Sequence, residues 1–334
     1  MFFVRRIPLA LLLLAVLAAA CGGAEPGTGD ADHRLRVVTT VSPLTSIVAN
    51  VVGDRAVVTG IVPEGTNSHT FEPPPRAART LAEADVVFLN GLRLEEPTRD
   101  LATGNRKAGA ETVELGTLAL PAADQIYDFS FPKEGGKPNP HLWTDPLLVR
   151  RYAEIVRDTM SRRDPAGAAI YQENAAAYIA RVEDFDAGLR AATATLPPER
   201  RKLLTYHDAY AYFAREYGWT VIGAIQVSDF EDPTPREVAA LIDQVRAERV
   251  PAIFGSEVFP SSVLERIGKE AGVRYVDELR DDDLPGPPGG PRHSLLALLQ
   301  TDFATMVRSL GGDAAALDAL DVRDVVADRS EYPQ

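Results

Sequence analysis

The sequence contains very little cysteine and histidine. Among its 334 residues there are one cysteine and five histidines. The single cysteine, Cys21, excludes a disulfide within the chain and also a Cys-x-x-Cys metal site. A His-Glu-x-x-His segment of the kind found in zinc proteases is absent as well. Any metal site must therefore be assembled from groups far apart in the chain, and each histidine has to be placed individually.

An excess of positive charge is also missing. Lys and Arg number 35 against 48 Asp and Glu, which gives a formal net charge of −13. Nucleic acid is excluded as a partner, because binding phosphates requires basic patches. The acidic balance suits a cationic ligand, although an acidic surface also simply keeps a protein soluble. An apolar content of 45% and a charged content of 25% are typical of a globular protein, and the length allows two domains.

The first twenty residues predict a signal peptide. A positive segment precedes an apolar run at residues 11–17, which is too short to span a membrane, and small residues follow. Cys21 comes directly afterwards. The pattern resembles the lipobox of bacterial lipoproteins, which implies a lipid on Cys21 that attaches the protein to the membrane, although Ala18 stands where Leu is usual. Ordinary secretion is the alternative. Either way we expect an exported protein, lipid-anchored on the outer face of the membrane or periplasmic, with residues 21–34 as a tether.

Short β-branched segments alternate with helical ones in both halves of the chain. This alternation predicts an α/β fold whose parallel-type sheets are flanked by helices. Residues 99–138 show no regular pattern. The strands we expect lie at residues 35–40, 56–62, 85–90, 202–206, 219–227, 252–255 and 273–276.

One unusually long helical pattern separates the two halves. Residues 166–195 predict a single helix, which at about 1.5 Å per residue would extend over roughly 40 Å. We therefore expect an N-terminal lobe at residues 35–165, this rigid linking helix, and a C-terminal lobe at residues 196–311. An acidic tail at residues 312–334 has no assigned function.

The clearest local signal surrounds His141. A loop rich in proline and glycine leads to this histidine, and a helix follows, with Asp145 as its N-cap and Pro146 as its first residue. The loop is therefore pinned close to the histidine ring. We expect Trp143 to pack beneath the loop rather than to bind a ligand.

Other potential ligands follow predicted strands. His69 lies in the loop after the second strand, and His207 and Asp277 stand at strand ends in the second half. Open α/β sheets bind ligands outside the carboxyl ends of their strands. Each histidine taken singly is more often a hydrogen-bonded structural residue than a ligand. Together with His141, however, they offer three imidazoles and one carboxylate, a set that suits Zn²⁺ and allows Mn²⁺.

Four blocks of the sequence resemble the metal-binding subunits of bacterial ABC importers for zinc and manganese. The resemblance runs from about residue 35 to 310. It implies two lobes, joined by one rigid helix, that hold one metal ion in the cleft between them with two ligands from each lobe. It also implies that the protein, as a monomer, delivers the metal to an ABC permease and its ATPase. The blocks are residues 38–43, 67–73, 139–146 and 206–210.

The resemblance also implies the ligands. His69 and His141 match the first two and His207 the third, while the fourth is an acidic residue best matched by Asp277. Glu278 and the acidic run at residues 281–283 are alternatives, although we expect that run to be a solvated loop. Histidine at the third position favours zinc, because manganese members usually carry a carboxylate there.

Manganese stays open as the metal, since the loop at residues 122–138 lacks the histidines that many zinc members carry there. A closed set of four protein ligands indicates a binding protein and not an enzyme. A zinc hydrolase, with water as the fourth ligand, and a surface adhesion lipoprotein are the alternative functions. We expect His33 and His293 to be exposed. Glu257 either orients a ligand imidazole or is an ordinary carboxylate at a strand end.

Overall fold

The computed structural model describes residues 34–225, 233–280 and 282–333. The predicted signal peptide, Cys21, His33 and Asp281 lie outside the described residues. Within the described part, none of the helices combines the length and the apolar character that a membrane crossing requires.

The first lobe is built on a parallel sheet of four strands in the order β2-β1-β3-β4. Strand β4 lies within residues 99–138, where the sequence shows no regular pattern. It has too little pattern to be recognised, because it is short and only Val113 in it is buried. The strands are β1 (Leu35–Thr39), β2 (Ala56–Gly60), β3 (Val86–Leu89) and β4 (Glu111–Glu114). The helices are α1 (Ser42–Val52), α2 (Pro75–Glu83), α3 (Glu96–Asn105) and α4 (Leu115–Ala119).

The second lobe repeats this arrangement. Its four parallel strands follow the order β6-β5-β7-β8, so each sheet places its first strand between its second and third. The strands are β5 (Lys202–Thr205), β6 (Thr220–Ala224), β7 (Ala252–Ser256) and β8 (Arg274–Leu279). The helices are α7 (Ala211–Tyr217), α8 (Pro235–Glu248), α9 (Ser262–Ala271) and α10 (Leu295–Ser309). The predicted fold class is confirmed.

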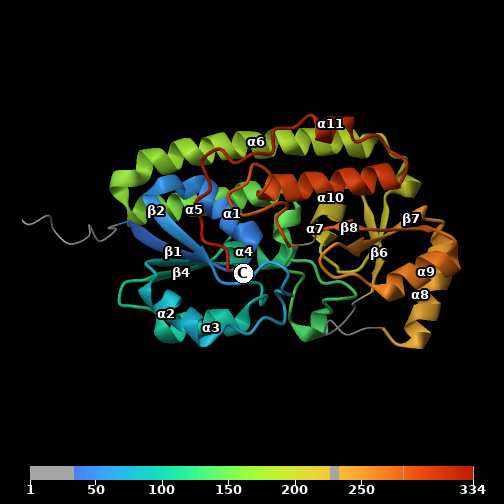
Figure 1. The fold of residues 1–334 in the computed structure, drawn as a ribbon, viewed down its shortest axis with the longest axis horizontal. Helices are drawn as coiled ribbons and strands as arrows, with labels where there is room; N and C mark the ends of the chain where they lie inside the picture. Colours follow the sequence, from blue (N-terminus) through green and yellow to red (C-terminus); the bar gives the residue numbers. More distant parts are fainter. Residues whose placement is uncertain (1–33, 226–232, 281, 334) are drawn as a thin grey trace, which may run out of the picture. The chain divides into compact units, whose positions relative to one another are not determined.

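One long helix connects the lobes. After α5 (Pro146–Arg163), helix α6 (Ala168–Ala194) runs for 27 residues and packs on α1 and α5 as well as on α10 (Figure 1). A single apolar cluster includes Val37 of the first sheet, Phe185 of α6 and Phe254 of the second sheet. Because this core is continuous, the lobes are held by buried packing and not only by the covalent link.

Helix α1 also joins the lobes through polar groups. Ser42, Ser46 and Asn50 are buried and share one face at a spacing of four residues. The Ser42 hydroxyl donates to the carbonyl of Asp282 (2.8 Å), and the Ser46 hydroxyl accepts from the backbone N–H of Leu295 (3.0 Å). These bonds fix a first-lobe helix to two segments of the second lobe.

The C-terminal tail, residues 312–333, is ordered and returns to the first lobe. It forms the short helix α11 (Ala315–Asp318) against α6 and then reaches the edge strand β2 (Figure 1). There the N–H of Gly60 donates to Glu331 O (2.8 Å), and the N–H of Glu331 donates to Val58 O (2.9 Å). The tail thus covers an otherwise open sheet edge.

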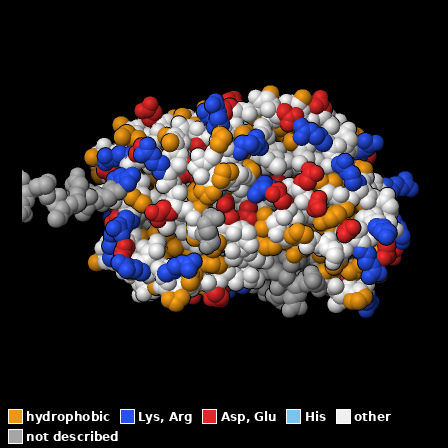
Figure 2. Space-filling view, in the orientation of Figure 1, with side chains coloured by type: hydrophobic (Ala, Val, Ile, Leu, Met, Phe, Trp, Pro, Cys, Tyr) orange, Lys and Arg blue, Asp and Glu red, His pale blue; other side chains and the backbone are white. Residues whose placement is uncertain are grey.

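Charged side chains are mixed over the face drawn in Figure 2. Basic and acidic groups alternate there, and no large continuous patch of Lys and Arg is visible on this face. Many of the ion pairs are between exposed groups, such as Arg266 with Glu270 (2.7 Å), and contribute little to stability.

Candidate metal centre

The loop that carries His141 is fixed locally, as its sequence predicts. Asp145 caps α5, because its Oδ1 accepts a hydrogen bond from the N–H of Leu147 (2.9 Å). The hydroxyl of Thr144 donates to the carbonyl of His141 (2.9 Å). Trp143 is fully buried, with its ring centroid 5.2 Å from that of His141 in an edge-on arrangement. The predictions for Asp145 and Trp143 are confirmed.

Three histidines converge between the lobes. The Nε2 atom of His69 lies 3.0 Å from Nε2 of His141 and 3.1 Å from Nε2 of His207. Within the described parts of the chain, only this group of metal-ligating side chains has its ligand atoms all within 4.8 Å of one another. Nitrogen ligands around tetrahedral Zn²⁺ are roughly 3.3 Å apart, since each Zn–N bond is about 2.0–2.1 Å. The histidines therefore need only a small outward shift to hold such an ion.

All three imidazoles are held in the neutral form. Burial lowers the pKa of His207 to about 4. Burial is the main reason that the pKa of His69 and of His141 also lies well below the usual value, and a proton on the neighbouring His207 would lower it further. A neutral imidazole is the form that binds a metal, so the site can accept a cation at neutral pH without first losing protons.

Asn139 sets the tautomer of His141. Its Oδ1 accepts from the Nδ1–H of His141 (2.8 Å), so the Nε2 lone pair faces the cluster. Its Nδ2 donates to Asp128 Oδ2 (3.0 Å) and to the carbonyl of Asp208 (3.0 Å), which lies next to His207. Such partners orient metal-binding histidines and raise their basicity. The sequence showed Asn139 within the His141 block but gave no sign of this role.

Asp277 is not brought to the histidines. It was placed at a strand end, but β8 continues to Leu279, so Asp277 lies within the strand. Side chains alternate across a strand, and here Val276 is directed into the core while Asp277 is exposed. The strand therefore ends two residues later than the sequence suggested, so the acidic run, and not Asp277, follows the end of the strand where ligands usually bind. Glu278 is exposed as well.

The acidic run lies beside the histidines instead. Asp282 and Asp283 line a small cavity together with His69 and His207. Asp282 Oδ2 accepts from the hydroxyl of Ser68 (2.9 Å), in the loop that carries His69. The carboxylate of Asp283 is buried and accepts from the N–H of Gly65 (2.9 Å). The expectation that this run is a solvated loop is thus wrong for Asp283, because the His69 loop covers it.

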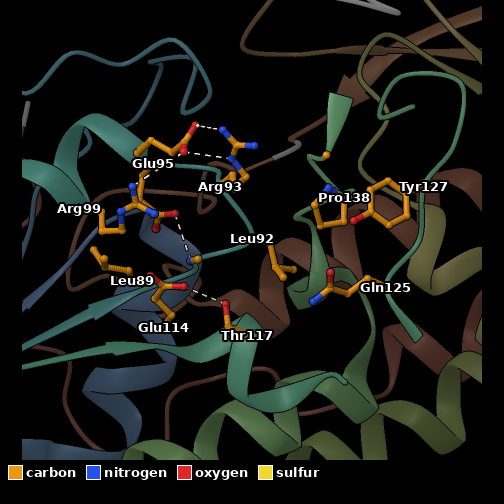
Figure 3. A pocket seen from close by; sticks show the side chains of 13 residues that line it. Leu89, Leu92, Arg93, Glu95, Arg99, Glu114, Thr117, Gln125, Tyr127 and Pro138 are labelled. Atoms are coloured by element: carbon orange, nitrogen blue, oxygen red, sulfur yellow. Dashed lines mark hydrogen bonds and ion pairs between the residues drawn. The ribbon is translucent and has the colours of Figure 1, made fainter. Parts of the chain in front are cut away.

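A larger cavity, of about 220 Å³, lies elsewhere, at the ends of β3 and β4 (Figure 3). Its walls mix arginine and glutamate side chains, and Arg93 is paired with Glu96 (3.0 Å). The buried carboxylate of Glu95 accepts from the N–H of Asn90 (2.6 Å), and burial raises the pKa of Glu95 to about 7. These charged groups already have hydrogen-bond or ion-pair partners, and no group of three metal-ligating side chains is found here among the described residues.

His293 is buried, and the expectation that it is exposed is wrong. Its Nε2 lies 3.1 Å from Glu64 Oε1, and its Nδ1 lies 3.9 Å from Asp328 Oδ2. Burial alone would lower the pKa of His293, but the two carboxylates outweigh it and raise the pKa to about 9. The side chain of Glu257 is 56% exposed and pairs with Arg280 (2.7 Å). This favours an ordinary carboxylate at a strand end over one that orients a ligand imidazole.

Two parallel α/β lobes, with converging side chains between them at the ends of strands, define a two-lobed ligand-binding protein. The chain belongs to the ZnuA family, described as the zinc-uptake complex component A periplasmic, whose model matches residues 37–309. The resemblance to metal-binding subunits of ABC importers is therefore confirmed, and with it the assignment as a binding component and not an enzyme. The C-terminal tail lies beyond the matched residues.

Individual relatives agree with this family. The chain is 30% identical over 300 residues to the manganese-binding lipoprotein MntA of Halalkalibacterium halodurans, covering 90% of this chain and 96% of that protein. It is 28% identical to the iron-binding protein YfeA of Yersinia pestis, covering 90% and 94%. The solved structure of the periplasmic zinc-binding protein TroA from Treponema pallidum matches with a TM-score of 0.75 at 24% identity, covering 83% of this chain and 99% of that one, and shows the shared fold. Relatives in this family are lipoproteins or periplasmic proteins, so the protein is extracytoplasmic.

Proposed function

We propose that this protein, as a monomer outside the cytoplasm, captures one divalent transition-metal ion between its lobes and delivers it to an ABC permease and its ATPase. The observation that carries the proposal is the convergence of three neutral imidazole Nε2 atoms at a buried position between the lobes. The named relatives bind manganese, iron or zinc, so their names support a divalent metal without selecting one.

The metal we propose is Zn²⁺, with Mn²⁺ as the alternative. His69, His141 and His207 supply nitrogen ligands, and zinc prefers nitrogen to a greater degree than manganese does. The fourth ligand we propose is Asp282, because it lines the same cavity as His69 and His207 and contacts the His69 loop. Asp277, which the sequence favoured, is the alternative to be tested against it.

The test is a comparison of metal affinities on the purified mature chain. We expect one Zn²⁺ per chain, bound more tightly than Mn²⁺, and a large loss of affinity in His69→Ala and His207→Ala. Asp282→Asn should weaken zinc binding, whereas Asp277→Asn, a matched change on the neighbouring strand, should not. Failure of the wild type to bind either metal tightly would overturn the function, and the reverse order of the two aspartate variants would overturn the choice of Asp282.

We also propose that Cys21 carries the lipid that attaches the protein to the membrane, in keeping with relatives that are named lipoproteins. Replacing it in Cys21→Ser should move the protein from the membrane fraction to the soluble extracytoplasmic fraction while leaving zinc affinity unchanged. A variant that stayed in the membrane fraction would contradict the anchor.

A further inference from the structure

The C-terminal tail is attached to both lobes at several points along its path. The hydroxyl of Thr195, at the end of α6, accepts from the N–H of Asp313 (2.8 Å). Farther along, Asp321 pairs with Arg181 of α6 (3.0 Å). The tail then reaches α1, whose Asn50 side chain donates to Asp324 (2.6 Å), before it joins β2. This segment lies outside the residues that the family model matches, which end at residue 309.

Near its end, the tail contributes a carboxylate to a buried cluster. Asp328 accepts from the hydroxyl of Tyr332 (2.7 Å) and from the N–H of Ser330 (2.9 Å), so its position is fixed. It forms an ion pair with His293, and the ring of Tyr332 packs edge-on against the ring of His293 at 4.4 Å. The tail therefore sets both the position and the surroundings of this histidine.

The other side of His293 holds Glu64, which belongs to the loop between β2 and α2. The same Glu64 oxygen accepts from His293 Nε2 (3.1 Å) and from the N–H of Leu284 (3.3 Å). One residue later, the N–H of Gly65 donates to Asp283. This loop carries His69, and Leu284 follows directly after the acidic run. Through Glu64, His293 is thus connected both to the loop that carries His69 and to the loop of the acidic run.

We propose that the C-terminal tail positions the metal site: Asp328 holds His293, His293 holds Glu64, and Glu64 aligns the His69 loop with the loop of the acidic run. The proposal rests on the proposed metal-binding function. If the loop is already ordered before the ion arrives, less conformational entropy is lost on binding. The affinity for the ion is therefore higher. The same restraint slows release, because His69 must move away from the ion before the ion can leave. Asp328, His293 and Glu64 are therefore positioning residues and do not touch the metal.

The experiment compares two matched changes in the tail of the full mature chain. Asp328→Asn removes the charge that holds His293, and Asp321→Asn removes a tail carboxylate that pairs with Arg181 and Arg323 and, within the described residues, with neither His293 nor Glu64. Zinc release into excess chelator is measured for each, with thermal unfolding as a check on folding. We expect release to quicken about 10-fold in Asp328→Asn, at the lower end of the effect of residues that support metal ligands, and to be unchanged in Asp321→Asn. Equal effects of the two variants would overturn the proposal.

Two further measurements separate positioning from general stability. Glu64→Gln should quicken zinc release as Asp328→Asn does, and the double variant should be no faster than Glu64→Gln alone, because both act through one chain of contacts. Additive effects would count against that chain. Hydrogen exchange of residues 63–70 in the metal-free protein should rise in Asp328→Asn and not in Asp321→Asn. This readout needs no metal, so it tests the tail even if the proposed function fails, and unchanged exchange would overturn the inference.

Discussion

Two buried histidine sites in this protein differ in charge. His141 and His293 are both fully buried, yet the pKa of His141 is well below the usual value and that of His293 is about 9. The difference lies in their partners. His141 faces the neutral amide of Asn139 and two other imidazoles, whereas His293 faces the carboxylates of Glu64 and Asp328. Burial favours the neutral ring, and only nearby negative charge reverses that preference.

The two sites are consequently suited to different roles. Neutral imidazoles leave lone pairs available for a cation, so the cluster around His141 suits a metal that comes and goes. His293 is already a cation and neutralises two acidic groups from distant parts of the chain, so it acts as a permanent cross-link. At the same burial, one residue type can therefore either offer a free lone pair to a cation or carry a structural charge.

The largest expected effect is on the metal side of this comparison. His141→Ala removes an imidazole from the cluster, and zinc affinity should fall by at least about 100-fold, beyond the loss seen for residues that merely support ligands. Competition with a chelator of known affinity measures it. His293→Gln should retain a stoichiometry of one zinc per chain. If His141→Ala bound zinc as the wild type does, His141 would not be a ligand.

The next effect is on stability. His293→Ala leaves the carboxylates of Glu64 and Asp328 buried without their cation, and the free energy of unfolding should fall by about 3 kcal/mol. Urea unfolding of the metal-free protein at pH 7 measures the change. Combining His293→Ala with Asp328→Asn should recover part of the loss, since one uncompensated charge is removed. If the free energy of unfolding fell no more than it does for an ordinary surface substitution, His293 would not be a cross-link.

A smaller effect is expected from the residue that orients His141. Asn139→Ala removes the acceptor for the Nδ1–H of His141, so zinc affinity should fall by about 10-fold, with the ligands themselves intact. Asn105→Ala, on the exposed end of α3, is the control and should bind as the wild type does. Equal affinity of the two variants would mean that the His141 tautomer is set without Asn139.

The mildest perturbation is a change of pH, and the two sites respond in opposite directions. The raised pKa of His293 means that its contribution to stability is complete below about pH 6.5 and is lost as the pH rises through about 9. The cluster has lowered pKa values, so the unfolded chain binds more protons there and stability falls as the pH drops below about 6.5 toward the His207 value near 4. Urea unfolding of the metal-free protein from pH 5 to 10 should show both declines.

The His293→Gln variant isolates the contribution of His293 to the pH dependence of stability. It should lose the decline between about pH 7 and 10 that His293 causes, and keep the decline on the acidic side. Parallel curves for the wild type and the variant above pH 7 would contradict the assignment of a raised pKa to His293.

Much of the fold and part of the site follow from sequence because the signals are local. The cap at Asp145 and the proline after it fix the His141 loop through contacts between neighbours in the chain. Strand β4 escaped notice because a short strand with one buried residue has too little pattern to recognise. The sequence places Asp277 at the end of β8, whereas the strand continues to Leu279, because its end is decided by pairing with β7, which the sequence of β8 alone does not reveal.

The sequence alone predicts the alternation of strands and helices, the long linking helix and a candidate metal site at His69, His141 and His207. Each of these depends on periodicity, on caps or on a block of neighbouring residues. Only the tertiary structure decided which carboxylates lie beside the histidines, the charge of His293 and the return of the tail to β2. His293 and Glu64 are 229 residues apart, and a pKa depends on which groups the fold brings within a few ångströms.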